Sequence, residues 1–378
     1  MTGSRLTAPH STAPRLTALV ESLPSSVPFV GPEAQERMRG RRFRARIGAN
    51  ENVFGPSPKA VEAMCAAAAG AWMYGDPENH DLKLALAKHH KVAPDNIVVG
   101  EGIDGLFGYI ARMTVEPGVH VVTSHGAYPT FNFHITGFGG RLHFAPYRND
   151  HEDLAALLDL ARRENARLVF LANPDNPMGT WWRAQDIAGL IKGLPSGALL
   201  CLDEAYCDFA PPEAQAPLDA DNPQVLRFRT FSKAHGLAGA RIGYAIGNAG
   251  LIKSFDKIRN HFGVNRIAQA GALAALADEA HLGKVIADVA AAREAIAAIA
   301  AANGLEALPS GANFVAVDCG RDGDFARRVL QGLIARDIFV RMPGVAPLDR
   351  CIRVSAGRAA DLEAFAAALP EALEHARA

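Results

Sequence analysis

The sequence predicts an α/β fold: a large domain with a mostly parallel central sheet covered by helices, plus a smaller C-terminal α/β domain. Three observations lead to this prediction. Short apolar stretches such as 167–173 and 197–203 run without polar alternation, which is typical of strands buried on both faces. Helical stretches separate these strands, as in parallel sheets. The chain of 378 residues is also too long for one small core.

Local signals predict the individual elements. Pro58 is placed in the first turn of a helix that ends near Gly70, and Asp81 could cap a helix over 82–90. The alanine-rich helices between 251 and 303 are expected to stop at Gly304. Further strands are expected at 96–100, 119–124, 141–145, 225–231, 241–247, 312–318 and 351–355, and further helices at 106–113, 151–164, 184–193, 323–336 and 359–376.

These elements divide the chain into three expected segments. Residues 1–45 form an N-terminal arm, since their first part is rich in Ser, Thr and Pro without periodicity. Residues 46–255 form the large domain. Residues 256–378 form the small C-terminal domain.

Composition narrows the possible functions. The net charge is −1 and the pI about 6.9, which favours neither a nucleic-acid nor a membrane-surface partner. The five cysteines lack C-x-x-C spacing and the thirteen histidines lack H-x-x-x-H spacing, so we expect no metal site. No secretory signal or apolar run of about 20 residues is evident, so a cytoplasmic location is expected.

A glycine-rich turn at Gly100–Gly105 matches G-x-G-x-x-G between a strand and a helix. Dinucleotide-binding turns of this kind also need an acidic residue about 20 residues further on. That window holds Ser124, His125 and Gly126 instead. A helix N-terminus that binds any phosphate is therefore the favoured interpretation, with a nicotinamide-dependent dehydrogenase as the alternative.

The chemistry is expected to centre on segment 229–241, in which Lys233 follows Ser232 and lies three residues after Thr230. Hydroxyls, the guanidinium of Arg241 and N–H groups beside glycines can together bind a phosphate. A lysine beside that phosphate can form a Schiff base with a carbonyl on the same molecule. Phosphate and aldehyde together indicate pyridoxal 5′-phosphate (PLP); the alternative is a solvated turn.

Other polar residues also follow predicted strands, and ligands of such sheets bind at the carboxyl ends of the strands. Asp203 ends a buried strand, where a carboxylate can pair with a protonated ring nitrogen. Asn176 and Tyr206 could hydrogen-bond a phenolate oxygen. Tyr128 could stack on a flat ring. Taken alone, each of them is also an ordinary turn or core residue.

Two arginines near the C-terminus could bind anions. Arg353 lies within an apolar strand, where a cation is costly unless it meets an anion. Its planar fork matches a carboxylate, and a structural salt bridge is the alternative. Arg341 could reach a second anionic group of the substrate.

Together these residues resemble the fold-type I, class I/II PLP-dependent aminotransferases, and in particular the histidinol-phosphate aminotransferase family. The resemblance runs from about Gly48 to the C-terminus. Its motifs are Ala49-Asn-Glu-Asn, Asn176-Pro-Met-Gly, Asp203-Glu-Ala-Tyr, Thr230-Phe-Ser-Lys, Leu237-Ala-Gly-Ala-Arg, Val264-Asn-Arg-Ile-Ala-Gln and Ile352-Arg-Val-Ser.

The resemblance implies roles for these positions. Lys233 would be the Schiff-base lysine and proton carrier, and Asp203 would pair with the pyridine nitrogen. Arg353 would bind the α-carboxylate, with Asn52 also at the substrate. Tyr74 would reach the partner's phosphate across a homodimer. The phosphate would lie on the backbone of Gly102, Ile103 and Asp104, beside Thr230, Ser232 and Arg241.

The implied reaction is a ping-pong transfer of an amino group from histidinol phosphate to 2-oxoglutarate. An aromatic amino-acid aminotransferase and a PLP-dependent decarboxylase or lyase of an amino-acid phosphate are the alternatives. The sequence departs from the family pattern at Ile103, Gly105, Asp175 and Met178. It also has Phe29 where the histidinol-phosphate branch tends to have a tyrosine, which bears on the substrate.

Overall fold

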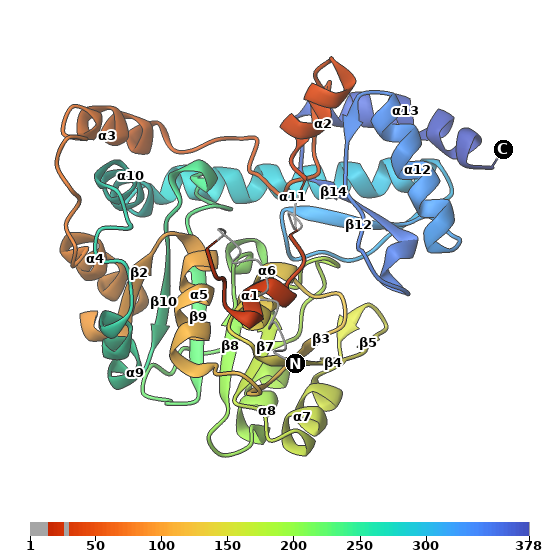
Figure 1. Cartoon of the computed structure of the whole chain (residues 1–378). Coiled ribbons are helices and arrows are strands. Elements are labelled where there is room, and N and C mark those ends of the chain that lie inside the picture. Colours follow the sequence, from red (N-terminus) through yellow and green to blue (C-terminus); the bar gives the residue numbers. More distant parts are fainter. Residues whose placement is uncertain (1–13, 26–29, 378) are drawn as a thin grey trace, which may run out of the picture.

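The computed structural model describes residues 14–25 and 30–377, and a seven-stranded sheet lies at its centre (Figure 1). The strands are β2 (Ile97–Gly100), β3 (His120–Ser124), β4 (Arg141–Ala145), β7 (Leu168–Ala172), β8 (Leu199–Asp203), β9 (Val225–Thr230) and β10 (Gly243–Gly247). Their order across the sheet is β2-β10-β9-β8-β7-β3-β4. Within this sheet β10 is antiparallel to both neighbours and the other pairings are parallel, which confirms the expected mostly parallel sheet.

Helices cover both faces of the sheet. They include α5 (Gly102–Thr114), α6 (Pro129–Gly137), α7 (Leu154–Arg163) and α8 (Ala184–Gly193). Phe170 of β7 packs edge-on against Phe107 of α5, with ring centroids 5.6 Å apart. Leu171, the next residue, belongs to the opposite cluster with Leu157 of α7 and Ile187 of α8. Successive strand residues point to opposite faces, so burial of both faces explains the apolar runs without alternation.

Two helices begin before the expected residue. Helix α5 begins at Gly102 rather than near residue 106, because Gly102 turns the chain with φ 79° and Ile103 is already buried. Helix α4 (His80–His90) begins before Asp81, which lies in its first turn rather than at its cap. The carboxylate of Asp76 instead accepts the backbone N–H of His80 at 2.7 Å.

The helix expected from residue 151 begins later. Strands β5 (Tyr147–Arg148) and β6 (His151–Glu152) pair as a short hairpin. The side chain of Asp153 then accepts the N–H of Ala156 and caps α7, which begins at Leu154. Pairing with β5 therefore uses the residues that the pattern assigned to the first helical turn.

A second, smaller sheet lies in the C-terminal part of the chain. Strands β11 (Glu306–Ala307), β12 (Phe314–Asp318) and β14 (Cys351–Ser355) are antiparallel in the order β11-β12-β14. Helices α12 (Gly323–Ala335) and α13 (Ala359–Arg377) pack on it, as expected for a small α/β domain. The long helix α11 (Glu279–Ala302) runs alongside both parts of the molecule (Figure 1).

The domain boundaries at 45 and 255 stay a prediction, and the packing of two segments favours shifting them. Helix α10 (Arg266–Leu276) packs against α3 (Pro58–Ala68) and α4, beside the large sheet. Strand β1 (Ala45–Arg46) pairs in parallel with β13 (Ile338–Phe339) of the C-terminal part.

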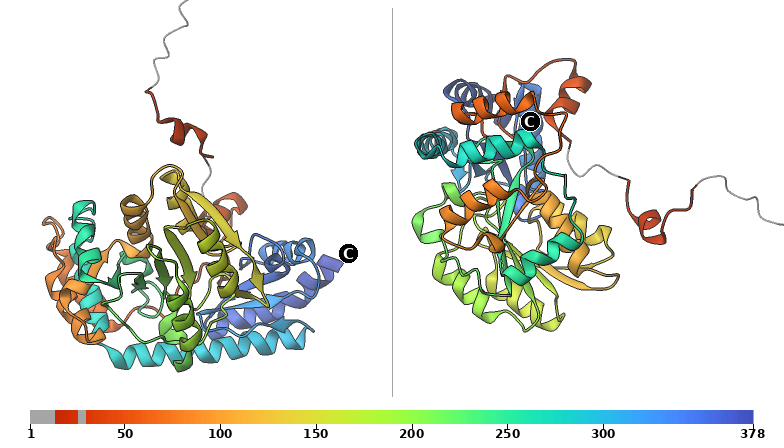
Figure 2. Two further views of the ribbon diagram at one scale, coloured as in Figure 1. Left: turned by 90° about the horizontal axis from the view of Figure 1, so that it is seen from below. Right: turned by 90° about the vertical axis from the view of Figure 1, so that its left-hand side faces the viewer.

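The N-terminal segment is only partly described. Helix α1 (Ala18–Ser22) extends away from the body, whereas α2 (Pro32–Arg39) lies against the C-terminal part (Figure 2). Residues 1–13 of the expected arm, and the Pro28-Phe29 departure, lie outside the described residues. Within the described ranges, none of the helices combines the length and apolar character needed to cross a membrane.

Candidate active site

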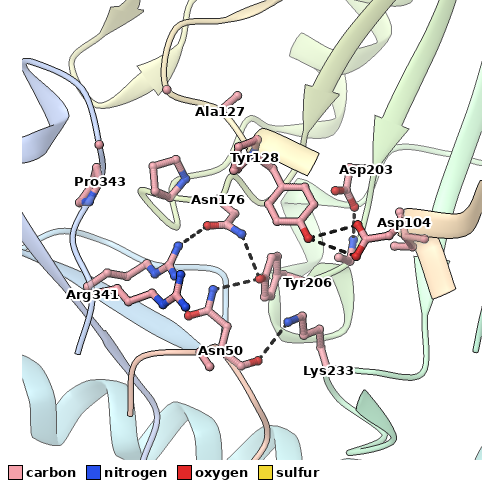
Figure 3. A pocket seen from close by; sticks show the side chains of 18 of the residues that line it. Asn50, Asp104, Ala127, Tyr128, Asn176, Asp203, Tyr206, Lys233, Arg341 and Pro343 are labelled. Carbon is pink, nitrogen blue, oxygen red and sulfur yellow. Dashed lines mark hydrogen bonds between the residues drawn. The ribbon is translucent and has the colours of Figure 1, made fainter. Parts of the chain in front are cut away.

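A cavity of about 670 Å³ lies where the expected polar clusters meet (Figure 3). Strands β2, β3, β7, β8 and β9 point the same way, so the segments after them meet at one edge. Strand β10 runs in the opposite direction, which brings Arg241, just before it, to the same edge. Predicted site residues in the lining are Ile103, Asp104, Tyr128, Asn176, Asp203, Tyr206, Thr230, Ser232, Lys233, Arg241, Arg341 and Arg353.

Lys233 lies in the turn after β9 and extends into this cavity. Its Nζ donates a hydrogen bond to the backbone oxygen of Asn50 at 3.1 Å and lies 5.4 Å from the centre of the Tyr206 ring. The side-chain amide of Asn52 donates to the backbone oxygens of Lys233 and Ala234, both at 3.1 Å. These two bonds hold the backbone of Lys233 in place.

Asp203 ends β8 and is buried, with 6% of its surface exposed. Burial raises the pKa of its carboxyl to about 7, and the backbone N–H of Ala205 and the charge of Lys233 offset this only in part. A buried carboxylate with so little compensation is costly. A cationic N–H donor from a ligand would relieve that cost.

Tyr206 is the centre of a hydrogen-bond network (Figure 3). Its hydroxyl accepts from the side-chain amides of Asn50 at 3.1 Å and Asn176 at 3.4 Å. Asn50 is buried in a left-handed conformation with φ 56°, and its Oδ1 accepts from the Ser355 hydroxyl at 3.1 Å. Because the bonds from Asn50 and Asn176 both use the Tyr206 oxygen as acceptor, its O–H group can donate to a ligand oxygen.

The opposite end of the cavity has groups that suit a phosphate. Helix α5 begins there without a side-chain cap. Gly102 has φ 79°, which other residues rarely adopt, and a Cβ there would come within 2.7 Å of Arg241 Nη2, so the guanidinium would have to shift. Thr230 donates its hydroxyl to Ser232 at 2.9 Å. Helix dipole, hydroxyls and guanidinium together favour an anion.

Asp104 and Tyr128 interact directly. The Tyr128 hydroxyl donates to Asp104 Oδ1 at 3.1 Å. Burial raises the pKa of Tyr128, and the Asp104 carboxylate raises it further, so the phenol keeps its proton. This bond fixes the ring of Tyr128 at the cavity wall, where it can stack on a planar ligand.

Arg353 is a cation without a carboxylate partner among the ion pairs of the described residues. Its Nη1 donates to Asn176 Oδ1 at 2.5 Å and its Nη2 to the Gly48 oxygen at 3.4 Å, while Nε is buried without an acceptor. Burial lowers the pKa of Arg353 to about 10. Arg341 also lines the cavity and donates to the oxygen of Val30 at 2.8 Å. This end of the cavity favours an anionic ligand group.

Comparison with known proteins identifies the family. The family model for aminotransferase class I and II matches residues 46–369. This chain belongs to that family.

Individual aminotransferases are similar over almost the whole chain. A solved histidinol-phosphate aminotransferase from Sinorhizobium meliloti, in complex with pyridoxal-5′-phosphate, is 55% identical with a TM-score of 0.94 and covers 96% of this chain and 99% of its own. A histidinol-phosphate aminotransferase of Moorella thermoacetica is 34% identical over 97% of this chain and 95% of its own length. One of Anaeromyxobacter sp. is 37% identical over 84% and 89%, respectively.

Class I and II aminotransferases use PLP, and the geometry of this aminotransferase fits that group. The uncompensated carboxylate of Asp203 suits the pyridinium nitrogen, and the cradle at Gly102 and Arg241 suits the phosphate. The glycine turn thus begins a helix whose start suits a phosphate, and the family assignment favours PLP over a dinucleotide.

Three predicted residues lie outside the cavity lining. Gly102 is the first residue of α5 and lies close to Arg241, which does line the cavity. The amide of Asn52 donates to the backbone oxygens of Lys233 and Ala234, which positions the lysine backbone; its contact with substrate stays a prediction. Tyr74 is 75% exposed and packs against Phe262 at a tilt of 35°, with ring centroids 4.6 Å apart.

Other residues of the aminotransferase site had no assigned role in the sequence-based prediction. Asn50 contacts Tyr206, Lys233 and Ser355, yet only its neighbour Asn52 was assigned a role. His125 and the loop 342–345 also line the cavity. Asn50 lies in a segment rich in turn-forming residues, and asparagine adopts the left-handed conformation more readily than most residues, so this conformation could have been predicted. Nothing local could have revealed the loop, because it reaches the cavity only through the tertiary fold.

Proposed function

We propose that this protein is a PLP-dependent aminotransferase that moves an amino group from histidinol phosphate to 2-oxoglutarate. The observation that carries the proposal is one cavity in which Lys233, Asp203 and Arg353 meet. Relatives named for this activity match almost the full chain at 34–55% identity.

When bound, PLP supplies a reactive carbonyl and a ring that withdraws electrons from the reacting carbon. Asp203 would pair with its ring nitrogen, and Tyr206 and Asn176 would hydrogen-bond its ring oxygen. Tyr128 would stack on the ring. Its phosphate would lie on the start of α5, beside Thr230, Ser232 and Arg241.

The amine of Lys233 is the proton carrier in this proposal. It is the basic side chain that extends into the cavity from the turn after β9, held there by the carbonyl of Asn50. It would take a proton from the reacting carbon of the donor and later give that proton back to complete the transfer. Asn52 would keep the backbone of this lysine in place.

Arg353 and Arg341 would serve both substrates in turn. Histidinol phosphate carries its negative charge on a phosphate ester, whereas 2-oxoglutarate carries two carboxylates. Arginine forks can bind either anion through paired N–H groups. A shared arginine pair accounts for a site that alternates between these two substrates.

A homodimer with shared active sites is part of the proposal, as is a cytoplasmic location. Trp72 and Tyr74 are 83% and 75% exposed, and Phe262 beside them is half exposed. Such an exposed aromatic patch suits an interface between copies of the chain. Tyr74 could then contact the phosphate of the partner's site.

The test is an assay of the purified PLP-loaded enzyme with 2-oxoglutarate and histidinol phosphate, phenylalanine or tyrosine. We expect glutamate to form at least about tenfold faster with histidinol phosphate than with the aromatic amino acids. Lys233→Ala should reduce transamination by about 10³-fold or more, whereas the exposed control Lys253→Ala should not change it.

Other outcomes would favour a different function. A preference for phenylalanine or tyrosine would indicate the aromatic aminotransferase. Release of carbon dioxide without an acceptor would indicate a lyase. Full activity of Lys233→Ala would contradict the role of this amine.

A further inference from the structure

A second cluster of reactive side chains lies away from the cavity, against helix α7. It consists of His120 at the start of β3, His143 in the edge strand β4 and Glu164 at the end of α7. In the parallel register His143 lies opposite Val122, so both histidines point to the face that α7 covers. The active-site cavity instead begins past the carboxyl end of β3.

We propose that His120, His143 and Glu164 form a binding site for a divalent transition ion of the zinc class. Each of the three residues offers one ligand atom within 4.8 Å of the other two. Imidazole nitrogen and carboxylate oxygen are ligands that such ions prefer, and three protein ligands leave a fourth position for water.

The two nitrogen–oxygen distances are compatible with a coordination shell. Nδ1 of His120 and Nδ1 of His143 lie 3.5 and 3.6 Å from the same Glu164 oxygen, Oε2. Ligands about 2.1 Å from one tetrahedral ion are separated by about 3.4 Å.

The nitrogen atoms of this cluster also lack other partners. Nδ1 of His120 and Nε2 of His143 are buried without a hydrogen-bond partner, while the two rings stack with centroids 4.8 Å apart. Buried polar atoms are normally satisfied, so the unpartnered Nδ1 of His120, which is also the atom that faces Glu164, points to a missing partner.

Glu164 itself favours a cation. It is the C-cap of α7, where the negative end of the helix dipole adds to its own charge. The two preceding arginines are engaged elsewhere: Arg162 donates to the oxygen of Gly193, and Arg163 pairs with Asp159. Arg141, next to His120 in the register, is exposed, so solvent and salt screen its charge.

An ion here would link three elements of the fold. Strand β4 is an edge strand, and the ion would join it to β3 and to the end of α7. The partly exposed side chains give the ion access from solvent. An ion that binds the folded chain but not the unfolded chain raises the free energy of unfolding. The two histidines come from different strands, so no short motif signals the site. The proposal does not depend on the substrate or the cofactor.

The experiment measures zinc bound to the PLP-loaded enzyme after treatment with a chelator and equilibrium dialysis against Zn²⁺, with Mg²⁺ as a control ion. We expect the wild type to bind one zinc ion per chain and the variants Glu164→Gln and His143→Ala to bind none. His89→Ala, which removes an exposed histidine from α4, should retain it. Zn²⁺ should also raise the Tm of the wild type by about 5 °C and that of Glu164→Gln by less.

Glu164→Gln keeps the shape of the side chain, so it remains informative if His143→Ala fails to fold. Equal zinc binding by the wild type and Glu164→Gln would overturn the proposal. So would a wild type that binds no zinc, because the cluster would then be an ion pair alone.

Discussion

Asp203 and Glu204 are adjacent buried carboxylates at the end of the same strand, yet their surroundings are opposite. Their exposed fractions are 6% and 5%. Burial raises the pKa of Asp203 to about 7. Burial also acts to raise the pKa of Glu204, but Arg229 and Arg227 together lower it below its usual value. The two side chains point to opposite sides of the strand, and only one side supplies guanidinium partners.

The arginines repeat this difference. Arg227 and Arg229 both donate to Glu204, the latter at 2.9 Å. Burial works against the charge of Arg229, but Cys207 and Glu204 raise its pKa well above the usual value. Arg353 meets only neutral oxygens, and its pKa falls to about 10. Glu204 is thus paired with guanidinium groups away from the cavity, whereas Asp203 and Arg353, which lack a side-chain partner of opposite charge among the ion pairs of the described residues, line the cavity.

The largest effect is expected where the paired charges are broken. Glu204→Ala leaves two buried guanidinium groups without their carboxylate and should lower the free energy of unfolding by about 3–5 kcal/mol. Urea unfolding of the PLP-free protein at pH 8 would measure it. The adjacent variant Asp203→Asn is the matched control and should not be destabilised. Similar losses in both variants would contradict the comparison.

Removing the unpaired cation should affect activity rather than stability. Arg353→Ala should reduce kcat/KM by about 10²–10³-fold, because a buried bidentate contact to a substrate anion contributes about 3–4 kcal/mol. Arg353→Lys keeps the positive charge but lacks the paired N–H groups of the guanidinium, so it should retain only part of the wild-type kcat/KM. Steady-state assays with both substrates would check this. A loss of folding stability with unchanged kcat/KM would show that Arg353 is structural.

Much of this contrast was predictable from sequence. Asp203 ends an apolar strand and Arg353 lies within another. A buried charge is costly at both positions, so each residue could be predicted to bind a group of opposite charge. The sequence could not show that Glu204 is paired, because Arg227 and Arg229 reach it across neighbouring strands. For the same reason it could not show the contacts of Asn50, or that His120 and His143 meet. Spacing reveals partners on one element, whereas partners on different strands depend on register.

A smaller effect concerns the pH dependence of stability in the PLP-free protein. The pKa of Asp203 is about 7 when folded and 3.8 when exposed, so the unfolded chain loses this proton first. The wild type therefore loses stability as pH rises from about 4 to 7 and keeps the full penalty above 7. Asp203→Asn lacks this penalty. It should exceed the wild type by on the order of a few kcal/mol at pH 8, with little difference at pH 4.

Urea unfolding of both proteins at pH 4, 6 and 8 would measure this difference. A gap that stays constant across this range would mean that Asp203 does not titrate as its burial implies.

The most direct test of the central claim compares the stabilisation that PLP gives to the wild type and to Asp203→Asn at pH 8. If the protonated ring nitrogen of PLP pairs with the Asp203 carboxylate, PLP should raise the Tm of the wild type by several degrees more than that of the variant. An equal rise in both proteins would show that the ligand does not relieve the buried charge of Asp203 and would contradict the account.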